Sequence, residues 1–233
     1  MRASACATAD GGRRFGVAHV RLLSLASFSP HPLPPDVNPT SGMCADDLVC
    51  IQVCGNPAKG LGAFAARHID AGTIVGHYMG EAISLSEMYF RYEGASRMDT
   101  PDEYEEANRR ARWMHDRQER GVSITGTYIL QAGKTSAGRI VLLDAEDPAT
   151  ANWTRYINHS AKRPNLEVVF PDRATALDEM ASDESARDGA GGASGASAVR
   201  FVALRSIEAG EELLFNYGED FDTDVGELLG FEQ

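Results

Sequence analysis

Short apolar runs, separated by glycine and polar residues, dominate this chain from about residue 48 onward. Between Cys50 and Ile83 each run is only a few residues long before a glycine or a charged residue interrupts it. Runs of this length are typical of small strands joined by tight turns, because a helix needs a longer periodic segment. Similar runs follow at Tyr128 to Leu130, Ile140 to Ala145, Asn165 to Phe170, Val199 to Leu204 and Leu213 to Phe215. The pattern predicts a mostly β fold of small sheets with short helices.

A strongly charged stretch, about residues 84–120, interrupts the strand pattern. Within it, residues 101–120 have the length and polarity of a solvent-exposed helix. Glu105 and Arg109 stand four residues apart, which is the spacing of a side-chain pair along one helical face. We predict a charged helical insert whose outer face is solvated.

Two other segments have compositions that disfavour a packed core. Residues 171–198 combine acidic side chains with repeats of glycine, alanine and serine, and such a segment buries too little apolar area to order itself. We interpret it as a disordered insertion, with an acidic docking site for a basic partner as the alternative. Residues 1–45 are basic and dotted with serine and proline. We interpret them as a flexible arm, with an organelle transit peptide as the alternative.

The size and charge of the chain limit the kinds of partner that it is expected to bind. At 233 residues it has room for one large domain or two small ones. Its 34 acidic and 22 basic residues leave a formal net charge of -12, which disfavours binding through nucleic-acid phosphates and suits a basic protein partner. No apolar run is long enough to span a bilayer. We therefore expect no direct nucleic-acid binding and no membrane association, and we expect a monomer.

The cysteines do not form a recognisable metal motif. Cys44, Cys50 and Cys54 are clustered, but they have no fourth sulfur or histidine nearby at zinc-ligand spacing, and Cys6 stands apart. We therefore predict no metal site. The residues are interpreted as reduced thiols of an intracellular protein.

Two motifs late in the chain place polar side chains in apolar surroundings. Asn158 and His159 directly follow Tyr156 and Ile157, and Tyr217 stands two residues after the apolar run Leu-Leu-Phe at residues 213–215. A buried polar group without a partner costs about 1–3 kcal/mol, so these side chains should have specific hydrogen-bond partners. Each motif also has a simpler interpretation, because Asn158 and His159 can cap a turn and Tyr217 can be a core aromatic.

Two further motifs lie earlier in the chain. Residues 59–64 read Lys-Gly-Leu-Gly-Ala-Phe, and residues 76–81 read Gly-His-Tyr-Met-Gly-Glu. Together with Asn-His-Ser at residues 158–160 and Gly-Glu-Glu at residues 210–212, they resemble the SET-domain family of protein lysine methyltransferases over about residues 49–221. The resemblance implies the SET-domain β-fold of small sheets, with a pseudoknot-like C-terminal threading. It also implies one domain at 48–221 and a short tail at 222–233.

The chemistry implied by the resemblance is methyl transfer from S-adenosylmethionine to a lysine amine. Tyr217 matches the family's catalytic tyrosine, and Tyr78 matches an aromatic residue that lines the same region. The positions that match the cofactor site are Lys59, Gly60, Leu61, Gly62, Arg155, Asn158 and His159. For Arg155 an ordinary surface ion pair is the alternative. Phe215 matches a Phe/Tyr position that controls the product and here favours di- or trimethyl-lysine, and we assign Tyr128 to substrate and product specificity.

The chain also departs from the family pattern. Ala161 stands where many members have a cysteine, and no cysteine follows Tyr217. We therefore expect the zinc-binding cap that follows many SET domains to be absent. Phe221 or Phe231 is a candidate aromatic lid over the cofactor, with simple packing as the alternative.

Three functional hypotheses follow from the resemblance. The first is a histone methyltransferase that acts on a basic tail in the nucleus. The second is methylation of a non-histone protein, in a chloroplast or mitochondrion if the arm is a transit peptide. The third is an inactive SET-like module that binds peptides without catalysis, which intact Tyr217, Asn158 and His159 disfavour.

Overall fold

The computed structural model describes residues 43–44, 47–55, 59–93, 101–170 and 199–218. Within these ranges the strands form four small sheets, as the short apolar runs predicted. One sheet has the order β1 (Met43–Cys44), β2 (Val49–Val53), β3 (Leu61–Ala65), and another has β4 (Ile74–His77), β10 (Arg200–Ala203), β9 (Leu166–Val169). The third has β5 (Glu81–Ser84), β7 (Ile140–Asp144), β6 (Ile129–Lys134), and the fourth pairs β11 (Leu214–Phe215) with β8 (Asn158–His159).

The predicted domain boundaries stay a prediction. The predicted arm, the predicted acidic insertion and the predicted tail lie almost entirely outside the described residues. Both candidate aromatic lid residues, Phe221 and Phe231, also lie outside them.

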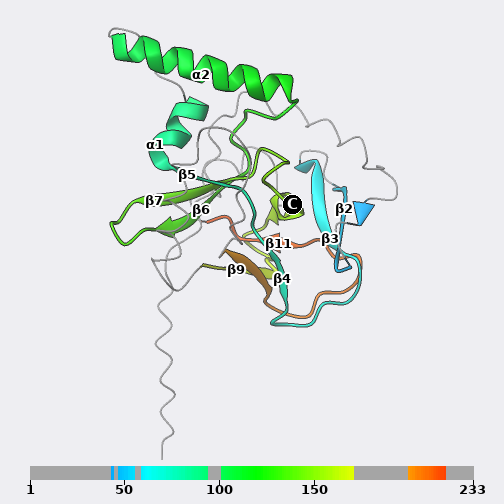
Figure 1. Ribbon diagram of the computed structural model, residues 1–233. Coiled ribbons are helices and arrows are strands. Elements are labelled where there is room, and N and C mark those ends of the chain that lie inside the picture. The colour runs from blue at the N-terminus through cyan, green and yellow to red at the C-terminus, as the bar shows by residue number, and fades with distance from the viewer. Residues whose placement is uncertain (1–42, 45–46, 56–58, 94–100, 171–198, 219–233) are drawn as a thin grey trace, which may run out of the picture.

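Helices occupy the segment that the charge pattern singled out. α1 (Leu85–Met88) begins at Ser84, whose hydroxyl accepts a hydrogen bond from the Glu87 amide at 3.1 Å. The π-helical η3 (Tyr89–Glu93) continues it, and α2 (Pro101–Glu119) follows. α1 and α2 lie at one end of the molecule, on the side of the sheet formed by β5, β7 and β6 (Figure 1). In the part of the chain that the structure describes, no helix is long and apolar enough to cross a membrane.

The side-chain pair predicted along α2 is wrong. Arg109 turns toward the preceding helices instead, because its guanidinium carbon lies 3.4 Å from the centre of the Phe90 ring and its Nη1 lies 3.4 Å from Glu87 Oε2. An aromatic face and a carboxylate on a neighbouring helix compete with the carboxylate one turn away. Arg109 therefore helps to attach α2 to the rest of the molecule.

The hydrophobic core is a cluster to which all four sheets contribute. In β10, Phe201 and Ala203 are buried whereas Arg200 and Val202 are partly exposed, as the two-residue period of a strand requires. The Phe201 ring packs edge-on against the Phe215 ring, with 5.0 Å between the ring centres. Burying a side chain of this size contributes about 1.5–3 kcal/mol. The core thus fixes β11, which carries part of the candidate site, against β10.

The segment at residues 213–215 contacts parts of the chain that are distant in sequence. β11 runs parallel to β8, and the Ser160 amide donates to the Phe215 carbonyl at 3.1 Å. Just before β11, the Leu213 amide donates to the Ala63 carbonyl in β3 at 2.8 Å. The segment is therefore held by both β8 and β3. Pseudoknot-like threading of this segment through a closed loop stays a prediction.

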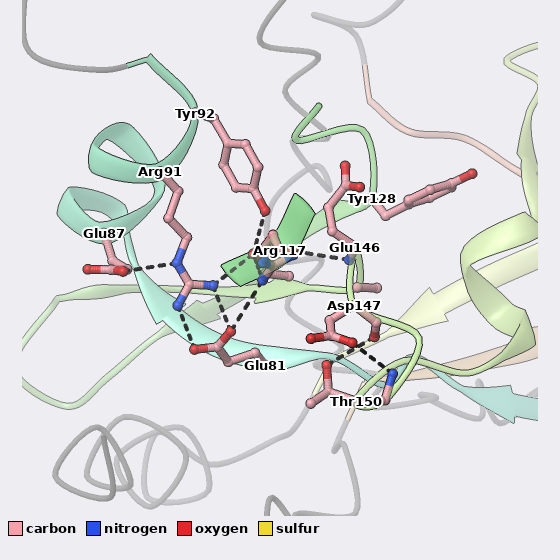
Figure 2. A network of polar contacts seen from close by, with 12 residues as sticks. Glu81, Glu87, Arg91, Tyr92, Arg117, Tyr128, Glu146, Asp147 and Thr150 are labelled. Atoms are coloured by element: carbon pink, nitrogen blue, oxygen red, sulfur yellow. Dashed lines mark hydrogen bonds and ion pairs between the residues drawn. The ribbon is translucent and has the colours of Figure 1, made fainter. Parts of the chain in front are cut away.

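A buried ionic network joins the helices to the sheet of β5, β7 and β6 (Figure 2). Asp144 ends β7 and is 0% exposed, and it accepts hydrogen bonds from Arg91 at 2.9 Å and from the Tyr92 hydroxyl at 2.6 Å. Arg91 also pairs with Glu81 at 2.6 Å, and Arg117 lies 3.6 Å from Asp144. Burial alone would lower the pKa of Arg91, but hydrogen bonding and the charges of Glu81 and Asp144 raise it overall. Arg91 therefore stays charged inside the network.

Candidate active site

Asn158 lies where β8, β3 and the residues before β11 come together. Its side-chain nitrogen Nδ2 is 3.1 Å from the Leu61 carbonyl oxygen, 3.0 Å from Glu212 Oε1 and 3.2 Å from Cys54 Sγ. The 3-10 turn η4 (Trp153–Tyr156) leads into β8 and so sets the position of this side chain. The contacts confirm that a polar side chain in this apolar stretch has specific partners.

Two glycines, Gly60 and Gly62, lie close to the contacts of Asn158. Gly60 has a φ of 65°, a left-handed conformation that glycine adopts without strain. A Cβ atom at Gly62 would lie 2.6 Å from Cys54 Sγ and 3.1 Å from both Asn158 Nδ2 and Glu212 Oε1. Any larger residue at position 62 would displace these polar groups, so the close approach requires glycine.

Sequence reasoning missed two members of this cluster, Cys54 and Glu212. The Cys54 thiol donates to Glu212 Oε1 at 3.4 Å, and Lys59 Nζ lies 3.8 Å from Glu212 Oε2. The sequence marks Glu212 only as part of a Gly-Glu-Glu turn, and Cys54 only as a free thiol. The single available signal was an acidic residue directly before an apolar strand, where a carboxylate needs partners.

The Cys54 thiol should react slowly with alkylating reagents in the folded protein. Burial, followed by the Glu212 carboxylate, raises its pKa from 9.0 to about 12, which lowers its thiolate fraction near neutral pH about 1000-fold. Mass spectrometry after iodoacetamide treatment should find Cys54 unmodified in the folded protein and modified in urea. Equal labelling rates in the two states would contradict the prediction.

Tyr217 is anchored through both its backbone and its hydroxyl. Its amide donates to His159 Nδ1 at 3.1 Å, and its hydroxyl donates to the Ile157 carbonyl at 2.7 Å. Its ring centre lies 4.5 Å from that of Phe215 and 5.2 Å from that of His159. His159 thus has a structural partner through its side chain, and the hydroxyl of Tyr217 has a fixed direction.

The Tyr217 hydroxyl stays protonated at neutral pH. Burial raises its pKa most, and the negative charge of Glu212 raises it further. Tyr217 is hydrogen-bonded to Ile157 and His159, the residues on either side of Asn158. Tyr217 and the cluster around Asn158, which were predicted as the catalytic and cofactor parts of one site, are therefore neighbours in the fold.

Tyr78 and Tyr128 form a second pair of tyrosines. Tyr78 is 5% exposed, and its hydroxyl donates to the Tyr128 carbonyl at 2.9 Å. Burial raises the pKa of Tyr78, so this hydroxyl also stays protonated. Tyr128 is only partly buried, and its ring centre lies 6.2 Å from that of Tyr156. Tyr78 consequently supports the backbone of Tyr128.

Arg155 lies among these tyrosines. Its guanidinium carbon is 5.3 Å from the centre of the Tyr128 ring and 4.9 Å from that of Tyr156. Its Nη1 donates to the carbonyls of Ala145 and Glu146 at 3.1 and 3.2 Å. Stacking on aromatic faces together with carbonyl acceptors holds the guanidinium in one orientation. These contacts link Arg155 to Tyr128, and its assignment to the cofactor stays a prediction.

The fold and the motifs define a known class of protein. The family model of the SET domain matches residues 60–218, and the chain belongs to this family. The four motifs on which the resemblance was based lie in or directly beside β3, β4, β8 and β11. The small sheets with few helices agree with the SET-domain fold.

The individual proteins to which this chain is similar include one curated relative and two solved structures. The chain is 29% identical over 164 residues to histone-lysine N-methyltransferase EZH2 of Chaetomium thermophilum, a match that covers 70% of this chain and 8% of that protein. The methyltransferase domain of human PR domain-containing protein 2 matches with a TM-score of 0.41 at 18% identity, covering 75% of this chain and 80% of that one. A crystal structure of an active polycomb repressive complex 2 in the stimulated state matches with a TM-score of 0.45 at 23% identity. The match covers 77% of this chain and 16% of that one.

Proposed function

We propose that this protein transfers methyl groups from S-adenosylmethionine to lysine side chains of a protein substrate. The observation that carries the proposal is that Tyr217 is hydrogen-bonded to Ile157 and His159, on either side of Asn158, whose side chain belongs to the polar cluster. Membership of the SET domain family and similarity to a histone-lysine N-methyltransferase support the same activity.

The residues around Asn158 fit an S-adenosyl cofactor. A Cβ at Gly60 would meet no atom within 4 Å, so the backbone there is open to a ligand. The amide of Asn158, which is held by Leu61 and Glu212, supplies a polar group of fixed orientation close by. The residues proposed to hold the cofactor are Lys59, Gly60, Leu61, Gly62, Asn158 and His159. When bound, S-adenosylmethionine supplies a methyl group on a positively charged sulfur.

The protein must favour the neutral form of the attacking lysine. A lysine amine has a pKa of about 10.4 in water, and enclosure by the rings of Phe215, Tyr217 and Tyr128 would lower it by desolvation. The Tyr217 hydroxyl donates a hydrogen bond to the Ile157 carbonyl. Its oxygen is therefore directed to accept a hydrogen bond from an N–H of the amine. The amine is thereby oriented for attack, and orientation of this kind contributes several kcal/mol, up to about 7–11 in well-aligned systems.

We infer that the substrate is a histone tail, methylated in the nucleus. The net charge of -12 supports a basic protein substrate. Incubation with a tritium-labelled methyl donor, using core histones and a histone-depleted cell extract at equal mass, tests this inference. Label chiefly in histones is the expected result. Label confined to the extract would instead indicate a non-histone substrate, such as a chloroplast or mitochondrial protein.

Replacing Phe215 with tyrosine should shift the product from di- and trimethyl-lysine to monomethyl-lysine. Phe215 is 3% exposed and its ring packs against those of Phe201 and Tyr217, so an added hydroxyl would reduce the room beside the amine. Mass spectrometry of the products after long incubation measures the shift. Phe90→Tyr is a matched control, because Phe90 lies under Arg109 beside α2. Monomethyl product alone from the wild type would contradict the assignment.

A further inference from the structure

The carboxylate of Glu146, just after β7, holds the segment that leads into β6. Glu146 is 2% exposed, and its Oε1 accepts hydrogen bonds from the Thr127 amide at 2.6 Å and from the Thr125 hydroxyl at 2.9 Å. Both donors belong to the residues directly before Tyr128, which lies beside Glu146 (Figure 2). Glu146 therefore fixes the backbone on the N-terminal side of Tyr128.

The two threonine hydroxyls reinforce this attachment. A carboxylate only accepts hydrogen bonds, so the single hydroxyl proton of Thr125 points to Glu146. The Thr127 hydroxyl, 2.6 Å from that of Thr125, is consequently the donor in their contact. Thr127 is thus bound to Glu146 directly through its amide and indirectly through its hydroxyl. Within the described part of the chain, Glu146 Oε2 has no hydrogen-bond partner, so the attachment depends on Oε1.

Tyr128 is held on its C-terminal side by different groups. Its carbonyl accepts from the Tyr78 hydroxyl at 2.9 Å and from the Ala145 amide at 2.9 Å. Peptide units are planar, so the direction in which a side chain leaves the backbone depends on the units on both sides of it. Tyr78 and Ala145 fix one side of Tyr128, and Glu146 fixes the other.

We infer that Glu146 is a positioning residue that keeps the Tyr128 ring in place and so limits how many methyl groups the substrate amine can carry. The inference rests on the proposed function, in which this ring helps to enclose the amine. Thr125 and Thr127 are only partly buried. Without Glu146 their donors would turn toward water, because a donor left without a partner is unfavourable. The Tyr128 ring would then move and leave more room for a methylated amine.

The relative use of methylated and unmethylated lysine tests this inference. Core histones mixed with a whole-cell extract serve as acceptors, either unmodified or after reductive dimethylation of their lysines. The measured ratio is trimethyl-lysine formed from the dimethylated acceptors over monomethyl-lysine formed from the unmodified ones. Glu146→Met removes the acceptor oxygen and keeps a side chain of similar length. It should raise the ratio about tenfold, as expected when a pocket gains room for one more carbon.

Two control variants separate the acceptor oxygen from a general effect on stability. Glu146→Gln retains an oxygen for the two threonine donors and should leave the ratio close to that of the wild type. Its amide nitrogen takes the place of the unpartnered Oε2, so the stability should fall although the ratio does not change. Asp147→Asn alters the neighbouring carboxylate, which accepts from the Ala149 amide at 2.9 Å and from Arg120 at 2.7 Å. It should not change the ratio.

A double variant tests whether Glu146 acts through Tyr128. In a Tyr128→Ala background, Glu146→Met should change the ratio less than about twofold, because the ring through which it acts is gone. If Glu146→Met does not fold, Glu146→Asp takes its place. This variant withdraws the carboxylate by one methylene and should raise the ratio in the same direction.

The outcomes separate this inference from the proposed function. An unchanged ratio in a folded Glu146→Met or Glu146→Asp protein would overturn the inference and leave the proposed function intact. The same holds if Glu146→Gln raises the ratio as much as Glu146→Met, or if the effect is equal with and without the Tyr128 ring. Wild-type protein that transfers no methyl groups to lysine in either acceptor would overturn the proposed function, and the inference with it.

Discussion

Replacing Tyr217 with phenylalanine should slow methyl transfer about 100- to 1000-fold, the effect typical of removing one group that stabilises a transition state electrostatically. The ring would remain packed against Phe215, whereas the hydroxyl that donates to Ile157 at 2.7 Å would be lost. The polar cluster around Asn158 would be unchanged. The affinity for the cofactor should therefore change less than about threefold.

Single-turnover methyl transfer and calorimetric cofactor binding measure these two effects separately. Tyr104→Phe is the matched control, because Tyr104 lies on α2 and is 57% exposed, and it should leave both quantities unchanged. A Tyr217→Phe protein that transfers methyl groups at close to the wild-type rate would exclude Tyr217 from the chemistry. If cofactor binding fell together with the rate, the role of Tyr217 would be structural.

Asp144→Asn should lower the free energy of unfolding by about 3–5 kcal/mol, the cost of removing one partner from a buried ion pair. The substitution preserves the shape of the side chain but removes the negative charge that offsets Arg91 and Arg117. Both arginines are almost fully buried, with exposed fractions of 5% and 3%, so water cannot replace the lost charge. The side chains of the network are directed toward one another between the helices and the sheet (Figure 2).

Urea unfolding followed by circular dichroism measures this change, provided that the slope with urea is preserved. Asp116→Asn is a matched control, because its carboxylate pairs with Arg120 at 3.0 Å but its side chain is 64% exposed. A surface change of this kind should alter the stability by less than about 0.5 kcal/mol. An effect of Asp144→Asn as small as that of the control would contradict the structural importance of the network.

The sequence pattern anticipated the elements of the fold better than their contacts. Short apolar runs correctly located β6, β7, β9, β10 and β11, because alternation and glycine punctuation are local properties of the chain. The charged helix was also located correctly as α2. The pair predicted within α2 was wrong, because Arg109 binds Phe90 and Glu87, which belong to other helices. Spacing along a helix describes only the neighbours within that helix.

In the candidate site, too, the sequence identified single residues better than their contacts. Asn158 and Tyr217 were found because polar side chains in apolar runs require an explanation. Glu212 and Cys54 were missed, because their contact joins residues separated by 158 positions. The link between Arg91 and Asp144 spans 53 positions and was missed for the same reason. Only the fold brings such residues together, so a single sequence contains no local signal for them.

The most direct test of the proposed activity is amino-acid analysis of proteins labelled by the wild-type protein with a radioactive methyl donor. Core histones and a whole-cell extract serve as acceptors, and the labelled proteins are hydrolysed and separated by chromatography. The proposal predicts that the label elutes with methylated lysine and that most of it is lost with Tyr217→Phe. Measurable cofactor binding with no labelled lysine in either acceptor would contradict methyl transfer and would favour a module that only binds peptides.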